Sequence, residues 1–359
     1  MVRIKSLDGW RAISVLLVIV GHLVNYRYGH GESRFATLTS YCATLGVNVF
    51  FVISGFLITS ISLKEEASTG SFSATNFYLR RVFRIVPAFA VYVGAAALLA
   101  AFGAIHQSLA GIARAAPFTG NLPGTECGWF VGHTWSLGYE QQFYLLFPLA
   151  FLLSLGARKR TMFAIHLVIV ATPFLMLVLP ASYRDLCIFV GRFSSITMGV
   201  LLGLCASQLE GLIGNRKILA CAVAAAAWAV IVDGVNILHI PYDLRFAVDM
   251  LIVPPAFAWL ILWSIGTTGW ANSVLNQPVL RYIGAISYSL YLWQQLFAGL
   301  PSLYADVAWF HWLLMFPAAA LSYHLVEKPF IAMGRWVSDK RKRGGASMDA
   351  NARPTASSQ

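Results

Sequence analysis

Long apolar stretches recur along most of this 359-residue chain, and short polar segments separate them. Each stretch has about 20 residues, enough for a helix to cross a hydrocarbon core of about 30 Å. The amphipathic stripes expected of a soluble core are missing from the sequence. The pattern predicts an all-α, polytopic membrane helical bundle of about ten transmembrane helices, at residues 10–28, 41–63, 85–105, 134–156, 161–180, 188–207, 218–238, 246–265, 282–301 and 307–327.

The positive charges between these stretches predict how the bundle is oriented. With the N-terminus in the cytoplasm, 20 of the 26 Lys and Arg residues fall on the cytoplasmic side and six on the outer side. Short cytoplasmic loops of membrane proteins carry such an excess of Lys and Arg. We therefore expect both termini to be cytoplasmic.

The composition agrees with a membrane location. Hydrophobic residues make up 58% of the chain and charged residues 11%, whereas soluble domains have about 25% charged residues. The net charge of +11 is distributed over short clusters between the apolar stretches. Such clusters encode topology, so we expect no nucleic acid partner.

The chain divides into two predicted parts. Residues 1–330 form a membrane domain, and residues 331–359 form a cytoplasmic tail that is first basic and then, from Gly344, small, polar and disordered. The two long connections are an inner loop at residues 64–84 and an outer loop at residues 106–133. The cysteines show no metal-ligand spacing; Cys127 and Cys187 both fall on the predicted outer side and could pair.

Two polar residues bracket the first apolar stretch. Arg11 and His22 are 11 residues apart, which at about 100° per residue places them within about 20° of one another on one helix stripe, about 16 Å apart. Asp8 can cap this helix and pair with Arg11. Polar groups inside a membrane are costly and indicate function. The alternative is that Arg11 anchors the inner edge and His22 is a hydrogen-bonded packing residue.

A second polar set opens the predicted span at residues 134–156. Glu140 follows Trp135 and Ser136 and precedes Tyr144. A carboxylate in such a position can orient and stabilise an imidazole that acts as a base. The alternative is a solvated glutamate within an interfacial aromatic belt. His133, seven residues before Glu140, is a rival base or a loop residue.

The remaining candidate residues are basic or aromatic. Arg80, Arg81 and Arg84 lie where the chain returns to the membrane from the cytoplasm. Guanidinium groups bind phosphate in a bidentate manner, so these arginines suit a nucleotide-bearing donor, although they are also typical of a plain topology signal. Arg192 is either a substrate partner or an interfacial residue. Tyr288 lies within an otherwise apolar span.

Six segments of the sequence together resemble the bacterial acyltransferase family 3, integral membrane proteins that O-acylate carbohydrates and related acceptors. In chain order they are "LDGWRAISVLLVIVGH" at 7–22, "FFVISGFLIT" at 50–59, "FYLRRVFRIVP" at 77–87, "TWSLGYEQQFYLLFP" at 134–148, "ISYSLYLWQQ" at 286–295 and "VEKPF" at 326–330. The resemblance covers nearly the whole chain, with every segment at the appropriate membrane position.

The resemblance implies roles for several of these residues. Arg11 and His22 match the basic residue and histidine, ten residues between them, that mark the family; Arg81 and Arg84 match its arginine pair for acyl-CoA, and Glu140 matches its glutamate. The sequence departs from the family where a second glutamate and a histidine are common, because it has Gln141 and Gln294 there.

The resemblance also implies the reaction. An acyl-CoA, most simply acetyl-CoA, would bind from the cytoplasm as co-substrate, and His22, oriented by Glu140, would be the general base that activates a hydroxyl of a cell-surface or lipid-linked carbohydrate. No metal and no bound cofactor is expected. The partners would be membrane lipid, acyl-CoA and a carbohydrate or glycosylated acceptor, and the location the bacterial cytoplasmic (inner) membrane.

Two other classes of function remain open from the residues alone. A transporter or flippase for a sugar-containing lipid could use the same polar cavity without chemistry, although the sequence shows no internal repeat of the kind found in many transporters. A structural or signalling membrane protein would leave the intramembrane histidine and glutamate without a purpose.

Overall fold

The computed structural model describes residues 4–28, 34–234, 239–298 and 311–351, and these residues are helical apart from their connections. The α-helices are α1 (Lys5–Tyr28), α2 (Arg34–Thr69), α3 (Ala74–Ala101), α4 (Leu109–Ala115), α5 (Trp129–Gly132), α6 (Trp135–Leu153), α7 (Arg158–Ala171), α8 (Arg184–Gly191), α9 (Ser194–Leu209), α10 (Arg216–Ala229), α11 (Tyr242–Gly266), α12 (Trp270–Leu275), α13 (Pro278–Ala285), α14 (Ser287–Ala298), α16 (Met315–Ser322) and α17 (Lys328–Asn351). No strand occurs in the described residues, so the predicted all-α class is confirmed.

Local sequence signals explain where several helices begin. The side chain of Ser73 accepts a hydrogen bond from the backbone N–H of Asn76 and caps α3, and Ser108 caps α4 in the same way. Asn215 accepts from two backbone N–H groups at the start of α10. These caps satisfy N–H groups that have no partner within the helix.

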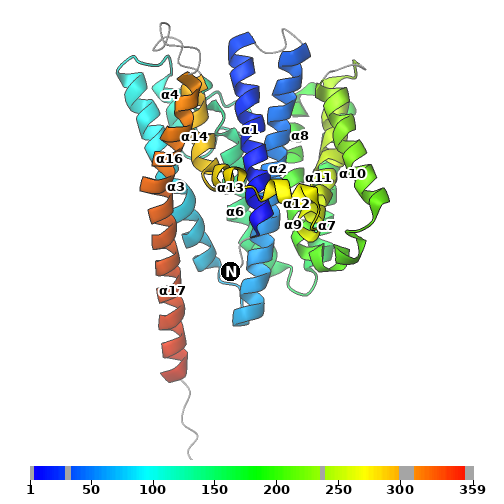
Figure 1. Cartoon of the computed structure of the whole chain (residues 1–359), viewed down its shortest axis with the longest axis vertical. Helices are drawn as coiled ribbons and strands as arrows, with labels where there is room; N and C mark the ends of the chain where they lie inside the picture. The colour runs from blue at the N-terminus through cyan, green and yellow to red at the C-terminus, as the bar shows by residue number, and fades with distance from the viewer. Residues whose placement is uncertain (1–3, 29–33, 235–238, 299–310, 352–359) are drawn as a thin grey trace, which may run out of the picture.

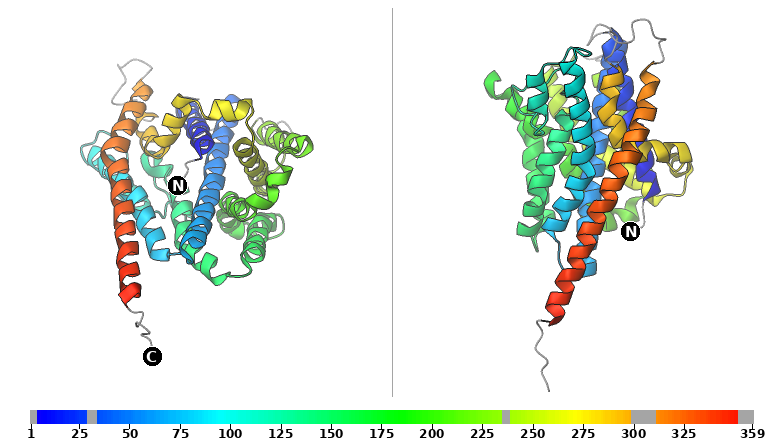
Figure 2. Two further views of the ribbon diagram at one scale, coloured as in Figure 1. Left: turned by 60° about the horizontal axis from the view of Figure 1, so that its bottom comes forward. Right: turned by 90° about the vertical axis from the view of Figure 1, so that its left-hand side faces the viewer.

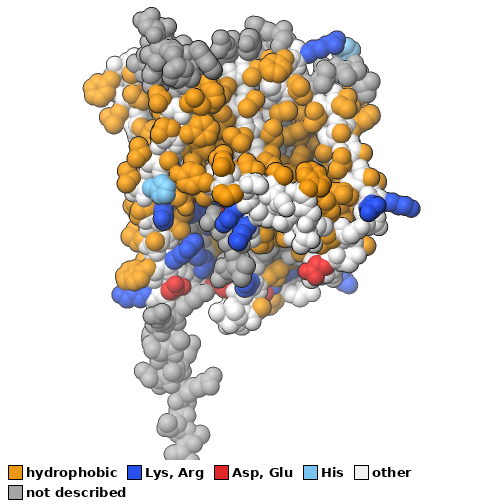
Figure 3. Space-filling model, viewed as in Figure 1, with side chains coloured by type: hydrophobic (Ala, Val, Ile, Leu, Met, Phe, Trp, Pro, Cys, Tyr) orange, Lys and Arg blue, Asp and Glu red, His pale blue; other side chains and the backbone are white. Residues whose placement is uncertain are grey.

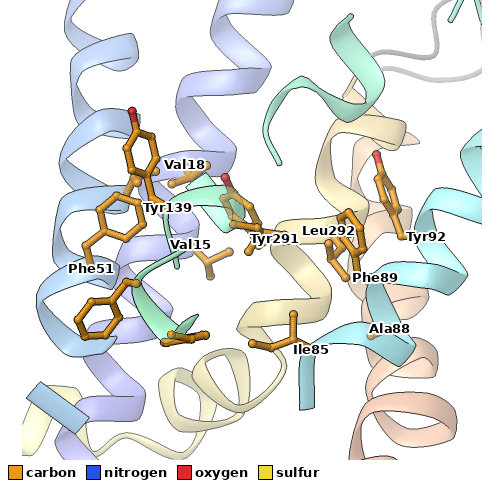
Figure 4. Packing of buried hydrophobic residues seen from close by; sticks show 14 of the residues in the cluster. Val15, Val18, Phe51, Ile85, Ala88, Phe89, Tyr92, Tyr139, Tyr291 and Leu292 are labelled. Atoms are coloured by element: carbon orange, nitrogen blue, oxygen red, sulfur yellow. The ribbon is translucent and has the colours of Figure 1, made fainter. Parts of the chain in front are cut away.

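Helices α1 and α2 stand side by side at the centre of the bundle (Figure 1). The other elements flank them, with α3, α14, α16 and α17 on one side and α9, α10 and α11 on the other (Figures 1 and 2). Figure 4 shows Val15 and Val18 of α1 facing Phe51 of α2, with Tyr291 of α14 beside them. The core therefore forms where these three helices meet.

Glycines allow a close backbone contact between α2 and α9. A Cβ atom on Gly55 would meet the carbonyl oxygen of Ile196, and a Cβ atom on Gly199 would meet the carbonyl oxygen of Val52. Each glycine thus lies against the backbone of the other helix. Small residues permit such approaches between membrane helices.

Six helical stretches are long and apolar enough to cross a membrane: Lys5–Asn25, Arg34–Thr69, Ala74–Ala101, Arg158–Leu177, Ala181–Leu212 and Tyr242–Gly266. They correspond to six of the ten predicted spans and support a multi-pass membrane protein. Parts of the predicted spans at 218–238, 282–301 and 307–327 lie outside the described residues. The count of ten and the cytoplasmic termini remain predictions.

The predicted span at residues 282–301 is not one continuous helix. It is divided into α13 and α14 by a bend at Ile286. Helices α12 and α13 run across the start of α1, whereas α14 runs along the bundle (Figure 1). A Cβ atom on Gly284 would meet the carbonyl oxygen of Asp8, so this glycine lets α13 pass against the backbone of α1.

The C-terminal tail also differs from its prediction. Helix α17 runs without a break through residue 330 to Asn351, so it includes the first residues of the segment predicted to be disordered. Ser338 is buried, and its hydroxyl accepts a hydrogen bond from the guanidinium of Arg80 at 3.3 Å. The start of the tail therefore packs on the membrane domain.

The surface of the bundle separates apolar from charged side chains. Hydrophobic side chains cover most of the visible face, and most visible Lys and Arg gather toward the end from which α17 projects (Figure 3). This is the end at which α1 begins (Figure 1). The arrangement is the one expected if this end faces the cytoplasm, and we call it the inner end.

Candidate active site

A small cavity of about 50 Å³ lies among α1, α2, α6 and α14. We call it the inner cavity. Its lining combines charged, hydroxyl and aromatic side chains, namely Arg11, Val47, Phe50, Phe51, Ser54, Ser136, Leu137, Glu140, Ser287, Tyr288 and Tyr291. Four of the predicted site residues, from three helices far apart in sequence, thus share one cavity inside an apolar bundle.

The carboxylate of Glu140 is held by hydroxyl groups. Ser54 donates to Oε1, and the Tyr144 hydroxyl donates to the same oxygen at 3.0 Å. Within the described residues, the hydrogen bonds of Glu140 run to these two groups and none runs to His22. The structure therefore groups Glu140 with the inner cavity and not directly with the predicted base.

Arg11 belongs to a cluster of buried charges at the inner end. It interacts electrostatically with Arg84, Asp8, Glu327 and Glu140. Its Nε atom is buried and makes no hydrogen bond among the described residues. The guanidinium is thus set among carboxylates and retains a donor for a further group.

Glu327 also belongs to this cluster, although it was not among the site residues predicted from the sequence. It is 2% exposed, and the Ser289 hydroxyl donates to its Oε2 at 3.0 Å. It also interacts electrostatically with Arg84 and Arg11. Its position in the "VEKPF" segment was the one indication in the sequence. That segment supported the family resemblance, but no function was assigned to its residues.

His22 lies nearer the outer end of α1, beyond Arg11. Its half-buried ring meets Trp129 of α5 edge-on, with ring centroids 6.1 Å apart and an interplanar angle of 72°. Both His22 and Arg11 are on one helix, as predicted, but only Arg11 lines the inner cavity. His22 therefore lies further from the inner end than Arg11 and outside the wall of the inner cavity.

The three arginines of the inner loop have different surroundings. Arg80 forms an ion pair with Glu65 at 2.7 Å in addition to its bond to Ser338. Arg81 lies over the rings of Tyr144 and Phe77, at 5.3 and 5.7 Å from the centroids. Arg84 faces the buried charge cluster described above. Arg80 is thereby engaged in structural contacts, whereas Arg81 interacts electrostatically with Glu140, and Arg84 with Arg11, in the wall of the inner cavity.

Hydroxyl groups connect α6 with α14. Ser136 and Tyr291 share a hydrogen bond of 2.6 Å, and Tyr291 donates to the backbone carbonyl of His133 at 2.5 Å. His133 lies in the turn between α5 and α6 and is buried there: it is 2% exposed, with Nε2 3.1 Å from the carbonyl oxygen of Leu292. Tyr288 donates to the carbonyl of Ile85 at 2.9 Å and so joins α14 to α3.

A second and larger cavity, of about 430 Å³, lies between the outer loop, α6 and α8. We call it the outer cavity. It is lined by Gly120, Asn121, Leu122, Pro123, Gly124, Thr125, Cys127, Gly132, Trp135, Tyr139, Asp185, Ile188, Phe189 and Arg192. It thus contains two predicted site residues, Trp135 and Arg192, which the structure separates from the inner cavity.

The cysteines on the outer side do not form the pair that the sequence allowed. Cys127 and Cys187 are both buried and both free. Burial raises the pKa of the Cys127 thiol, which keeps it protonated and unreactive at neutral pH.

Comparison with known proteins agrees with this architecture. The profile of an acyltransferase domain family matches residues 4–325. A predicted O-acetyltransferase of Staphylococcus aureus (strain COL) is 29% identical over 369 residues, which cover 91% of this chain and 57% of that protein. A predicted peptidoglycan O-acetyltransferase of Bacillus subtilis (strain 168) is 26% identical over 92% of this chain and 55% of its own length.

A shorter similarity links the chain to the peptidoglycan O-acetyltransferase OatA of Listeria monocytogenes, 33% identical over 42% of this chain and 24% of that protein. The chain spans about half the length of the first two relatives. No solved structure matches it significantly. The family profile covers nearly the whole chain, and the described helices form a multi-pass bundle; the chain therefore belongs to acyltransferase family 3.

Proposed function

We propose that this protein transfers an acetyl group from cytoplasmic acetyl-CoA to a hydroxyl of a cell-surface or lipid-linked carbohydrate, in the bacterial cytoplasmic membrane. The observation that carries the proposal is the group of buried charges around the inner cavity, with Arg11 and Glu140 in its wall. Burying such charges in an apolar bundle is expensive, so they indicate a functional site. Membership in an acyltransferase family supplies the reaction class.

In the proposed reaction His22 is the general base. It accepts the proton of the acceptor hydroxyl while that oxygen attacks the thioester carbonyl carbon. The carbon–sulfur bond then breaks, the thiolate of coenzyme A leaves, and it recovers the proton from the imidazole. The products are the acetyl ester and free coenzyme A, so the base returns to its starting state. General bases of this kind contribute about 10²- to 10⁴-fold in rate.

Arg11 and Glu140 act on the donor path in this proposal, not as direct partners of His22. Arg11 lies about 16 Å before His22 on the helix, where its guanidinium can position the thioester arm. The inner cavity of about 50 Å³ is smaller than such an arm. Donor binding therefore requires this cavity to widen.

Replacing both Arg81 and Arg84 with Ala is expected to raise the KM for acetyl-CoA by about tenfold or more. Hydrogen bonds to charged groups contribute about 1.5–3 kcal/mol each, and these two guanidiniums have the position to bind the donor phosphates. Initial rates at varied acetyl-CoA, in inside-out membrane vesicles, measure the effect. Arg160→Ala, an exposed arginine at the inner end, serves as the matched control. If the KM for acetyl-CoA is unchanged in the double variant, the two arginines do not bind the donor and serve only as a topology signal.

The proposal is tested directly with the purified chain in liposomes that contain acetyl-CoA on one side and peptidoglycan glycan, the acceptor named for two relatives, on the other. Release of coenzyme A that depends on the glycan, together with ester-linked acetate on it, is the expected result. The competing transporter function predicts movement of a sugar-containing lipid across the membrane without coenzyme A release, which would overturn the proposal.

A further inference from the structure

The outer cavity contains a cation that lacks a carboxylate partner. The guanidinium of Arg192 lies 4.5 Å from the centre of the Trp135 ring and 5.8 Å from that of Phe246. Among the described residues it forms no ion pair, whereas Arg80, Arg158 and Arg184 each pair with a carboxylate. Arg192 is thus held against an aromatic face with its charge available to a ligand.

The walls of the outer cavity have the mixture of aromatic and polar groups typical of small-ligand sites. Trp135 and Tyr139 supply aromatic surface, with ring centroids 5.8 Å apart. Asp185 adds a carboxylate, and the side chain of Asn121 is fixed by two hydrogen bonds to Gln142, of 2.8 and 3.0 Å. Aromatic faces and carboxylates suit a sugar ring with hydroxyl groups on its edge.

Helix α6 contributes residues to both the outer cavity and the inner cavity. Trp135 and Tyr139 line the outer cavity, whereas Ser136 and Glu140, each one residue further along, line the inner cavity. Helix α5 makes a second connection, because Gly132 lines the outer cavity and Trp129 contacts the ring of His22. A ligand in the outer cavity would therefore contact two helices, α5 and α6, that also carry the ring neighbour of His22 and part of the inner-cavity wall.

We propose that the outer cavity is the acceptor site and that Arg192 selects a sugar carrying an acidic group, a carboxylate or a phosphate. This inference rests on the proposed transfer of an acyl group to a carbohydrate. Arg192 would pair with the acid in a bidentate manner, and Asp185 would accept hydrogen bonds from sugar hydroxyls. Arg192 is in this view a specificity-determining residue.

Direct binding to the purified full chain tests the inference independently of turnover. One fluorescent probe is a tetrasaccharide of alternating N-acetylglucosamine and N-acetylmuramic acid. The matched neutral probe is the tetramer of N-acetylglucosamine, which differs by lacking the carboxylate-bearing ether groups. A third probe is that tetramer phosphorylated at its primary hydroxyls. Fluorescence polarisation gives each dissociation constant.

We expect the wild-type chain to bind at least one acidic probe about tenfold more tightly than the neutral one, and the better acidic probe identifies the group. Arg192→Gln should remove this preference, since one charge-assisted bidentate pair is lost. Arg184→Gln is the matched control: it lies on the same outer side, is exposed and pairs with Asp243, and it should retain the preference.

Two results would overturn the inference: a wild-type chain without preference for either acidic probe, or an Arg192→Gln variant that keeps it. Failure of the proposed function gives a different result. A preference that depends on Arg192, in a chain that releases no coenzyme A with any glycan, would support the acidic-sugar site and overturn acyl transfer as its purpose.

Discussion

Replacing His22 with Ala is expected to reduce acetyl transfer by about 10²- to 10⁴-fold, the contribution typical of a general base. The imidazole is the group proposed to accept the hydroxyl proton, and Ala leaves no group at this position that can accept it. Ester-linked acetate on the acceptor, measured after incubation of proteoliposomes with acetyl-CoA, gives the rate. Size-exclusion chromatography in detergent verifies that the variant remains folded.

His166→Gln is the matched control for this experiment. His166 is a buried histidine elsewhere in the bundle, and its Nδ1 is 2.8 Å from the hydroxyl of Thr197 on α9, away from both cavities. Glutamine can retain a hydrogen bond there, so near-normal transfer is expected. If His22→Ala keeps near-normal activity, His22 is not the base, and the buried His133 becomes the next candidate.

Replacing Gly199 with Val is expected to destabilise the bundle by about 3 kcal/mol or more, the upper range for overpacking. Its Cβ would meet the carbonyl oxygen of Val52 and approach the backbone nitrogen of Phe56 to 2.9 Å. Backbone atoms cannot turn aside as a side chain can, so α2 and α9 would have to separate. The yield of monodisperse protein and its melting temperature measure the loss.

Gly94→Val provides the comparison, because Gly94 is also a helical glycine but a Cβ atom there would meet nothing within 4 Å. Valine has a slightly better helix propensity than glycine, so this variant should keep the wild-type yield and melting temperature. Equal behaviour of the two variants would show that the α2–α9 contact has room to relax.

The helical class and most of the long spans follow from the sequence, because the bilayer imposes a length and an apolar composition on each helix. The bend at Ile286 could not be predicted in this way. Residues 282–301 contain no charged side chain and are mostly apolar, and hydropathy does not distinguish one straight helix from two. The contact that places α13 across α1, between Gly284 and Asp8, joins residues more than 270 positions apart in sequence.

The candidate site was predictable where a single residue departs from its surroundings. Arg11 and Glu140 stood out as charges at apolar stretches, and both line the inner cavity. The assembly of charges around them was not predictable, since Glu327 meets Arg11 and Arg84 only after α3 and the C-terminal helices pack together. Helical periodicity describes the faces of one helix and does not tell which helices become neighbours.

The position of Glu140 illustrates the same limit. The sequence predicts a carboxylate that orients His22, whereas the described hydrogen bonds join it to Ser54 and Tyr144. Arg80 is a similar case: it lies in the same cluster as Arg81 and Arg84, yet its ion pair with Glu65 and its bond to Ser338 give it a structural environment. The spacing of residues along the chain does not indicate that these groups become the partners of Glu140 and Arg80.

The two cavities have no lining residue in common, and α6 contributes neighbouring residues to each. A cell that energises its membrane with a proton gradient loses that energy through any continuous water-filled passage. In the proposed function, α6 separates the donor cavity from the acceptor cavity, so the acetyl group would be transferred without a continuous water-filled passage through the bundle. If the bundle acetylates a carbohydrate outside the cell as proposed, this separation preserves the proton gradient across the membrane.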